Sequence, residues 1–175
     1  MDYEANVATE LSILRSLRHP TLVRYIGSFE TSTSLWIVME FAPGGDLHSV
    51  LTQKGSLDLP SSAFITAEVV LGLEYLHSQN VIYGDLKPEN VLLDANGHIR
   101  LTDFGSARRI SNETAEPSAA QANAMEEERV EGTAEYVAPE VAAGGQASFE
   151  SDAWALGCVV FQLLAGHCIV LHDEA

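Results

Sequence analysis

Hydrophobic positions recur with helical spacing in three stretches of the chain. Residues 5–18 place Val7, Leu14 and Leu17 on one face, which predicts a short amphipathic helix. Glu10 falls on that same face, one turn from Val7 and one turn from Leu14. A carboxylate that faces a core needs a cationic partner, although a position at the rim of the stripe fits the same spacing.

Two longer stretches also predict helices. Residues 60–78 begin with a proline in the first turn and carry an apolar stripe of Ile65, Val69, Leu73 and Leu76. Residues 153–171 are apolar enough to resemble a membrane span, but Gly157, Gln162, Gly166 and His167 interrupt them. We interpret this last stretch as a buried core helix.

Extended segments alternate with turn signals in the first half of the chain. Residues 21–30 and 34–41 read as two strands around a polar turn. Residues 90–94 and 98–102 flank Asn96-Gly97, which is a strong hairpin signal. If these two residues form the loop, Asn90 lies opposite Asp103, and Asp85 arrives from five residues upstream. Oxygen ligands gathered in this way suit Mg²⁺, although one Asp beside one Asn is common in hairpins.

Composition and charge limit the expected partners and the expected cellular location. Nine Lys and Arg against 25 Asp and Glu give the 175 residues a formal net charge of −16. We therefore expect no nucleic acid and no anionic membrane as a partner, whereas basic peptides are compatible with this charge. Only two cysteines are present, and the N-terminus lacks the apolar segment of a signal peptide. These features predict a cytoplasmic location and no transmembrane segment.

Three ordered motifs resemble the signature of eukaryotic-type serine/threonine protein kinases. They are Tyr83-Gly84-Asp85-Leu86-Lys87-Pro88-Glu89-Asn90, Asp103-Phe104-Gly105 and Ala138-Pro139-Glu140. Residues 132–140 and 151–158 look most like the AGC group, especially the phosphoinositide-dependent protein kinases. The resemblance covers nearly the whole chain.

The resemblance implies catalytic and metal-binding roles. Asp85 matches the aspartate that accepts or orients the proton of the substrate hydroxyl, and Lys87 matches the lysine that steadies the transferred phosphoryl group. Asn90 and Asp103 match the Mg²⁺ ligands, and Thr133 matches the threonine that bonds to the catalytic aspartate and lysine. Taken singly, Lys87 and Thr133 also fit ordinary loop and turn positions; their joint order favours the catalytic roles.

The resemblance also implies an ATP site and its supports. The nucleotide side comprises the gatekeeper Met39, the hinge residues Glu40 to Ala42, Asp46 near the ribose, and Glu89 and Leu92. The supporting set comprises the helix C glutamate Glu10, Phe104 and Gly105 beside the metal ligand, Glu140, and Asp152, which anchors the catalytic loop from the buried helix. Taken alone, Asp152 also fits a simple helix N-cap.

The sequence departs from the family pattern at three places. The only lysines are Lys54 and Lys87, so no lysine precedes Glu10, and no glycine-rich loop is recognisable. We therefore expect these 175 residues to be poorly active or inactive on their own. Gly84 replaces the arginine that receives the activation-loop phosphate, and Arg129 occupies the position of the phosphorylated serine. Our hypothesis is that phosphorylation there does not switch this loop.

The predicted fold class is α+β, a partial protein-kinase-like fold. Helix C and two strands form a remnant of the N-lobe at 1–41, and a mainly helical C-lobe up to helix F follows at 42–175, with an activation loop at about 106–131. The predicted function is transfer of the γ-phosphate of ATP, with Mg²⁺, to protein substrates. The alternatives are a non-catalytic pseudokinase or truncated regulator that binds another kinase, and a nucleotide-binding module without transfer activity.

Overall fold

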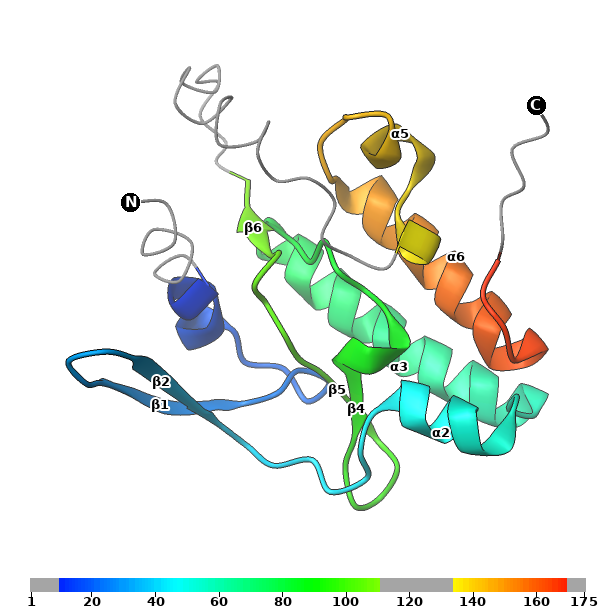
Figure 1. Cartoon of the computed structure of the whole chain (residues 1–175), viewed down its shortest axis with the longest axis horizontal. Helices are drawn as coiled ribbons and strands as arrows, with labels where there is room; N and C mark the ends of the chain where they lie inside the picture. The colour runs from blue at the N-terminus through cyan, green and yellow to red at the C-terminus, as the bar shows by residue number, and fades with distance from the viewer. Residues whose placement is uncertain (1–9, 111–133, 170–175) are drawn as a thin grey trace.

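The computed structural model describes residues 10–110 and 134–169 of the chain. These residues form a mixed α+β fold of small antiparallel sheets and helices, as predicted (Figure 1). Three sheets contain two strands each, in the pairs β1-β2, β3-β6 and β4-β5. The two longest helices, α3 (Leu59–Ser78) and α6 (Phe149–Ala165), pack against each other.

The N-terminal helix ends earlier than the sequence predicts. Residues 10–16 are helical and bury Ile13 and Leu14, with Leu17 following, while residues 5–9 lie outside the described chain. The predicted end at residue 18 is wrong. Pro20 disfavours helical geometry at His19, so the helix ends before the His19-Pro20 pair.

The two predicted strands are present as β1 (Tyr25–Glu30) and β2 (Leu35–Met39). They pair antiparallel, and the turn between them closes with a bond from the Thr31 amide to the Ser34 carbonyl at 2.8 Å. The first strand begins later than predicted, because Thr21 and Val23 bond instead to Leu101 of β5 (Ile99–Leu101). This pairing ties the N-terminal part to the rest of the molecule.

Both long helices have sequence-coded ends. The side chain of Asp58 caps α3 by accepting the Ser61 amide at 2.8 Å, and Ser148 and Ser151 form a capping box at the start of α6. The apolar stripe of α3 is buried, as predicted. The helix predicted at 153–171 is confirmed as a core helix, but α6 runs from Phe149 to Ala165. By length and composition, α3 is the one helix within 10–110 and 134–169 that could cross a membrane.

The hairpin of β4 (Val91–Leu93) and β5 corrects the predicted register. Leu92 pairs with Arg100, so Asn90 lies opposite Thr102 and not opposite Asp103. The loop has three residues because the Asp94 carboxylate accepts the amides of Asn96 and His98 at 2.8 and 3.0 Å. Gly97, with φ of +85°, supplies the left-handed position that ends such a loop.

Short elements complete the fold around this hairpin. Helix α2 (Leu47–Lys54) follows the hinge, and β3 (Val81–Ile82) pairs with β6 (Arg108–Arg109). Single turns lie at η1 (Pro88–Asn90), η2 (Ala134–Tyr136) and α5 (Pro139–Ala142). The core is continuous from the first helix to α6 and includes Leu47, Leu76, Val91, Leu101 and Leu163.

Candidate active site

A buried carboxylate on α6 fixes the segment that carries Asp85. Asp152 is 1% exposed, and its two oxygens accept the backbone amides of Tyr83 and Gly84 at 2.9 and 2.8 Å. The Nε2 atom of His77, on α3, lies 2.8 Å from the same carboxylate. Three groups from two other segments therefore converge on one side chain, and the turn before Asp85 has a defined position.

The side chain of Tyr83 stabilises the same turn through contacts with Phe104 and Thr102. Its ring is fully buried and packs edge-on against Phe104, with 5.5 Å between the ring centroids. Its hydroxyl donates to the Thr102 carbonyl. Burial raises the pKa of Tyr83 well above the ordinary value, and the nearby charges of Asp85, Asp103 and Asp152 add to this. The ring is therefore a neutral support of the site.

Asp85, Lys87 and Asn90 form one cluster. The Nζ atom of Lys87 lies 2.7 Å from Asp85 Oδ2, and the Asn90 side-chain amide donates to that oxygen at 2.9 Å and to the Asp85 carbonyl at 2.8 Å. Asn90 is buried, whereas Asp85 and Lys87 keep 24% and 19% of their side chains exposed. The carboxylate is thus oriented by two donors yet remains reachable.

The charge of Asp103 affects the carboxyl group of Glu10. Asp103 has a left-handed backbone, with φ of +55°, and its Oδ1 atom accepts the Gly105 amide at 3.2 Å. Glu10 is half-buried, and its pKa is raised by burial and by the charge of Asp103. No ion pair to Glu10 occurs among the residues that the structure describes. The pKa of Glu10 is thus raised by the charge of another carboxylate, although the sequence leads us to expect a cationic partner there.

The oxygens of Asn90 and Asp103 fit a hard divalent cation. The Asn90 amide nitrogen is committed to Asp85, so its Oδ1 atom is left as an acceptor, and Asp103 is exposed with one oxygen outside its local bond to Gly105. Mg²⁺ prefers such ligands and retains several waters, so two protein oxygens are a reasonable set. The described chain contains no cluster of three or more His, Cys, Asp or Glu side chains suited to a metal.

The residues assigned to the nucleotide border the same hairpin. Asp46 caps α2 by accepting the Ser49 amide at 2.7 Å, and its backbone bridges to Leu92 in β4. Glu40, directly after β2, has its carboxylate between Arg24 and Arg100. Met39 directly precedes Glu40 and Ala42 follows two residues after it, and Glu89 pairs with His48 on α2 at 3.3 Å. The predicted set thus lines up along the hinge, the start of α2 and β4.

Two predicted residues stand apart from this cluster. Thr133 lies outside the described residues, as do positions 111–131 of the predicted activation loop. Glu140 lies on α5 with an exposed side chain, and no ion pair to it occurs in the described part of the chain. The sequence reasoning missed His77, Asp94 and Arg100. Only their polar character inside or beside apolar elements offered a signal.

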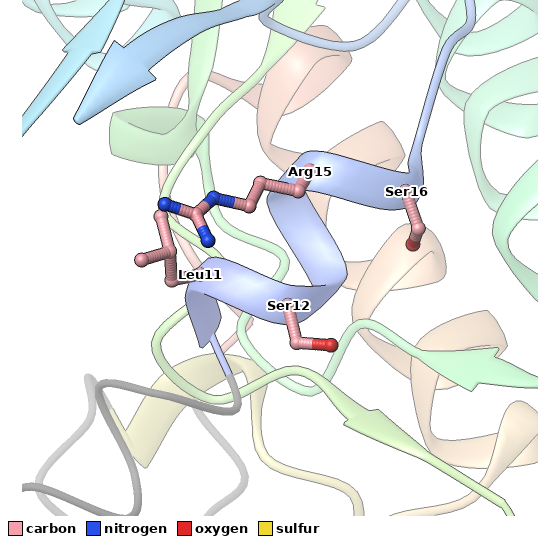
Figure 2. Close-up of a pocket in the computed structure, with 4 residues that line it drawn as sticks. All are labelled: Leu11, Ser12, Arg15 and Ser16. Carbon is pink, nitrogen blue, oxygen red and sulfur yellow. The ribbon is translucent and has the colours of Figure 1, made fainter.

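Two shallow cavities lie away from Asp85. One, of about 390 Å³, is bordered by Leu11, Ser12, Arg15 and Ser16 on the N-terminal helix (Figure 2). The other, of about 290 Å³, lies behind the hinge and is lined in part by Val23, Arg24, Glu40 and Arg100. Neither is lined by Asp85, Asn90 or Asp103, so the site is defined by its side-chain contacts.

Comparison with known proteins assigns the fold. The family model for the protein kinase domain matches residues 1–175. The chain belongs to the protein kinase family. The serine/threonine-protein kinase RUNKEL of Arabidopsis thaliana is 42% identical over 161 residues, which is 91% of this chain and 11% of that protein.

The relatives include the kinases that the motifs predict. The 3-phosphoinositide-dependent protein kinase 1 of Arabidopsis thaliana is 41% identical over 93% of this chain and 33% of its own length. The cAMP-dependent protein kinase catalytic subunit PRKX of Homo sapiens is 39% identical over 93% of this chain and 42% of its own length. The predicted resemblance to AGC kinases is confirmed. The chain spans between 11% and 42% of the length of these three relatives.

The kinase motif of this chain carries glycine at position 84 for a reason that the backbone shows. Gly84 has φ of +79°, and a Cβ atom there would lie 2.8 Å from the Ser106 carbonyl oxygen. Replacing Gly84 by Ala is expected to lower the free energy of unfolding by about 1–3 kcal/mol, from the left-handed backbone and the close contact. Urea denaturation followed by tryptophan fluorescence measures this change.

The matched control for that substitution is Gly157→Ala. Gly157 lies in α6, and a Cβ atom there would meet nothing within 4 Å. This variant is expected to be neutral or stabilised by up to about 1 kcal/mol, because alanine favours the helix. Equal stability of Gly84→Ala and the wild type would contradict the account of position 84.

Proposed function

We propose that this kinase domain transfers the γ-phosphate of ATP to serine and threonine hydroxyls of protein substrates. The observation that carries the proposal is the Asp85–Lys87–Asn90 cluster, held by the anchor of its loop on Asp152. Each of these side chains has a function in phosphoryl transfer, and their contacts require no rearrangement to form.

Asp85 supplies the acceptor for the proton. Both contacts that described residues make to its carboxylate end on Oδ2, so Oδ1 faces the substrate hydroxyl in this proposal. Orientation of that hydroxyl and uptake of its proton make the oxygen a better nucleophile. The ammonium of Lys87, 2.7 Å from Asp85 Oδ2, offsets negative charge on the phosphoryl group during its transfer.

The chain's own ligands for Mg²⁺ are Asn90 and Asp103 in this proposal. Bound Mg²⁺ would neutralise phosphate charge and orient the triphosphate. The amide of Asn90 has a second function, because its nitrogen holds Asp85 while its oxygen is left for the metal. One side chain thereby links the proton acceptor to the metal position.

The substrate is proposed to carry basic residues near the acceptor hydroxyl. The support is the formal net charge of −16 and two carboxylates: Glu89 in η1, the turn that contains Asn90, and Asp46 at the start of α2, which packs against η1. Complementary charge raises the rate of encounter and favours basic peptides over acidic ones.

A second candidate is a non-catalytic regulator that binds another protein. The β1-β2 hairpin exposes Ile26, Phe29 and Trp36 by 58%, 56% and 54%, and the last two rings stack at 6.0 Å. Contiguous exposed apolar side chains of this kind are typical of contact surfaces.

Phosphate transfer and its metal dependence separate the candidates. The full-length protein from its source cell, with γ-labelled ATP, Mg²⁺ and a basic Ser/Thr peptide, is expected to label the peptide. Chelation by EDTA is expected to lower the rate by about 10³-fold or more, because the triphosphate loses its charge neutralisation. Nucleotide binding without labelling would favour a binding module, and no nucleotide binding with retained partner binding would favour the regulator.

A further inference from the structure

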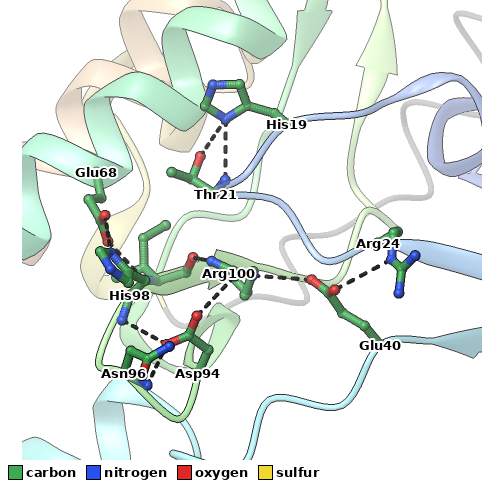
Figure 3. Close-up of polar contacts among 10 residues, drawn as sticks. His19, Thr21, Arg24, Glu40, Glu68, Asp94, Asn96, His98 and Arg100 are labelled. Carbon is green, nitrogen blue, oxygen red and sulfur yellow. Dashed lines mark hydrogen bonds and ion pairs between the residues drawn. The ribbon is translucent and has the colours of Figure 1, made fainter.

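Arg100 connects three segments of the molecule through one guanidinium. Its Nε atom lies 3.2 Å from Glu40 Oε1, its Nη2 atom donates to Asp94 Oδ2 at 2.9 Å, and its Nη1 atom donates to the Ile99 carbonyl at 2.9 Å (Figure 3). Glu40 follows β2, whereas Asp94 opens the turn between β4 and β5. The guanidinium therefore holds the hinge against the hairpin.

The contacts of Arg100 are partly shielded from water. The side chains of Arg100, Glu40 and Asp94 are 22%, 26% and 18% exposed. Arg24 also approaches Glu40, at 3.6 Å, but its side chain is 66% exposed. Shielded, charge-assisted hydrogen bonds are stronger than exposed ion pairs, so Arg100 is the main partner of Glu40.

The place of Arg100 in the hairpin gives this contact a functional consequence. Arg100 pairs with Leu92, so the two side chains lie on one face of the hairpin, away from the buried Val91 and Leu101. The same two strands lead directly to Asn90 and Asp103. One residue thus relates the hinge to the metal ligands.

We propose that Arg100 is a positioning residue for nucleotide binding. By fixing the Glu40 carboxylate to Asp94, it holds the backbone of residues 40–42 in place relative to the hairpin that leads to Asn90 and Asp103. This inference rests on the proposed function, because it assigns the adenine end of ATP to the hinge. Arg100 touches no reacting atom, so its loss weakens binding of the nucleotide and leaves the chemical step in place.

Lysine cannot replace Arg100 fully. A single ammonium cannot satisfy Glu40, Asp94 and the Ile99 carbonyl in the planar arrangement that the guanidinium provides. The variant Arg100→Lys therefore keeps the charge and loses part of the geometry. It is the conservative variant that distinguishes positioning from simple charge balance.

The test uses the full-length protein with Arg100→Gln, Arg100→Lys, Glu40→Gln and the double variant Glu40→Gln/Arg100→Gln. Arg100→Gln is expected to raise KM for ATP about tenfold and to change kcat by less than about twofold, with Arg100→Lys between it and the wild type. The double variant is expected to be no worse than Arg100→Gln, since both changes break one contact. Arg24→Gln, at the exposed partner, is the matched control and is expected to leave KM unchanged.

Several results would overturn the inference. The first is an unchanged KM for ATP in Arg100→Gln. The second is a loss of kcat in Arg100→Gln as large as its rise in KM. The third is additivity of the effects of Arg100→Gln and Glu40→Gln in the double variant. Absence of phosphate transfer by the wild type would instead refute the proposed function. In that case calorimetric titration with adenosine decides: about tenfold weaker binding by Arg100→Gln supports the inference, and equal binding, or no binding by the wild type, overturns it.

Discussion

Replacing Asp85 by Asn is expected to lower kcat by about 10²–10⁴-fold, the usual contribution of a positioned general base. Asparagine has the same shape, but it lacks the carboxylate that takes the proton. It also weakens the contact with Lys87, now 2.7 Å from Oδ2. KM for ATP is expected to change little, because Asp85 is not among the residues assigned to the nucleotide. Steady-state kinetics of the full-length protein with a Ser/Thr peptide measure both parameters.

The matched control for Asp85→Asn is Glu74→Gln. Glu74 is exposed on α3, so this change also converts an acid to an amide but outside the cluster. It is expected to leave kcat within about twofold, as most surface substitutions do. If Asp85→Asn kept kcat within about threefold of the wild type, Asp85 would not be the proton acceptor and the proposed function would fail.

Order along the chain was enough to predict the two long helices, though not all their bounds, and to match the kinase motif around Asp85. The stripe of Ile65, Val69 and Leu73 predicted α3 because a helix that buries one face must place apolar residues every three or four positions. Asp85 and Asn90 could be assigned roles because both lie within one local motif that resembles the kinase signature. Such short-range patterns can be recognised in the sequence without knowledge of the tertiary structure.

The hairpin register shows what local reasoning could not decide. Asn96-Gly97 favours a two-residue loop, yet the Asp94 carboxylate accepts two amides and stabilises a three-residue loop. These bonds also lower the pKa of Asp94, with the Asn96 amide as the largest cause. A shift of one residue then moved the partner of Asn90 from Asp103 to Thr102. A side-chain bond thus outweighed the turn propensity.

Partners distant in the sequence were equally hidden. The alternation in β5 indicates that Arg100 points away from the core, but nothing in it identifies Glu40, which lies 60 positions earlier. His77 was likewise visible only as a polar residue near the end of a helix. Such contacts depend on how whole elements pack, and many polar residues in one sequence could satisfy the same requirement.

Replacing Asp152 by Ala is expected to lower the free energy of unfolding by about 3–5 kcal/mol, the usual cost of removing one partner from a buried charged contact. The change leaves the amides of Tyr83 and Gly84 and the His77 ring without their acceptor. Because small domains are stable by only about 5–15 kcal/mol, this is a large fraction of the total. Urea denaturation followed by tryptophan fluorescence measures it, with Trp154 on α6 as a local probe.

Two companion variants determine whether the acceptor itself matters. Asp152→Asn keeps the size of the side chain. In the wild type both carboxylate oxygens accept hydrogen bonds, so the NH₂ group of the asparagine would point at a donor. We expect it to cost about 1–3 kcal/mol, the price of one unsatisfied buried group. Glu150→Ala, in the same first turn of α6 but exposed, is expected to leave the free energy of unfolding close to that of the wild type. If Asp152→Ala cost as little as Glu150→Ala and kept kcat, the loop that carries Asp85 would be held by other contacts.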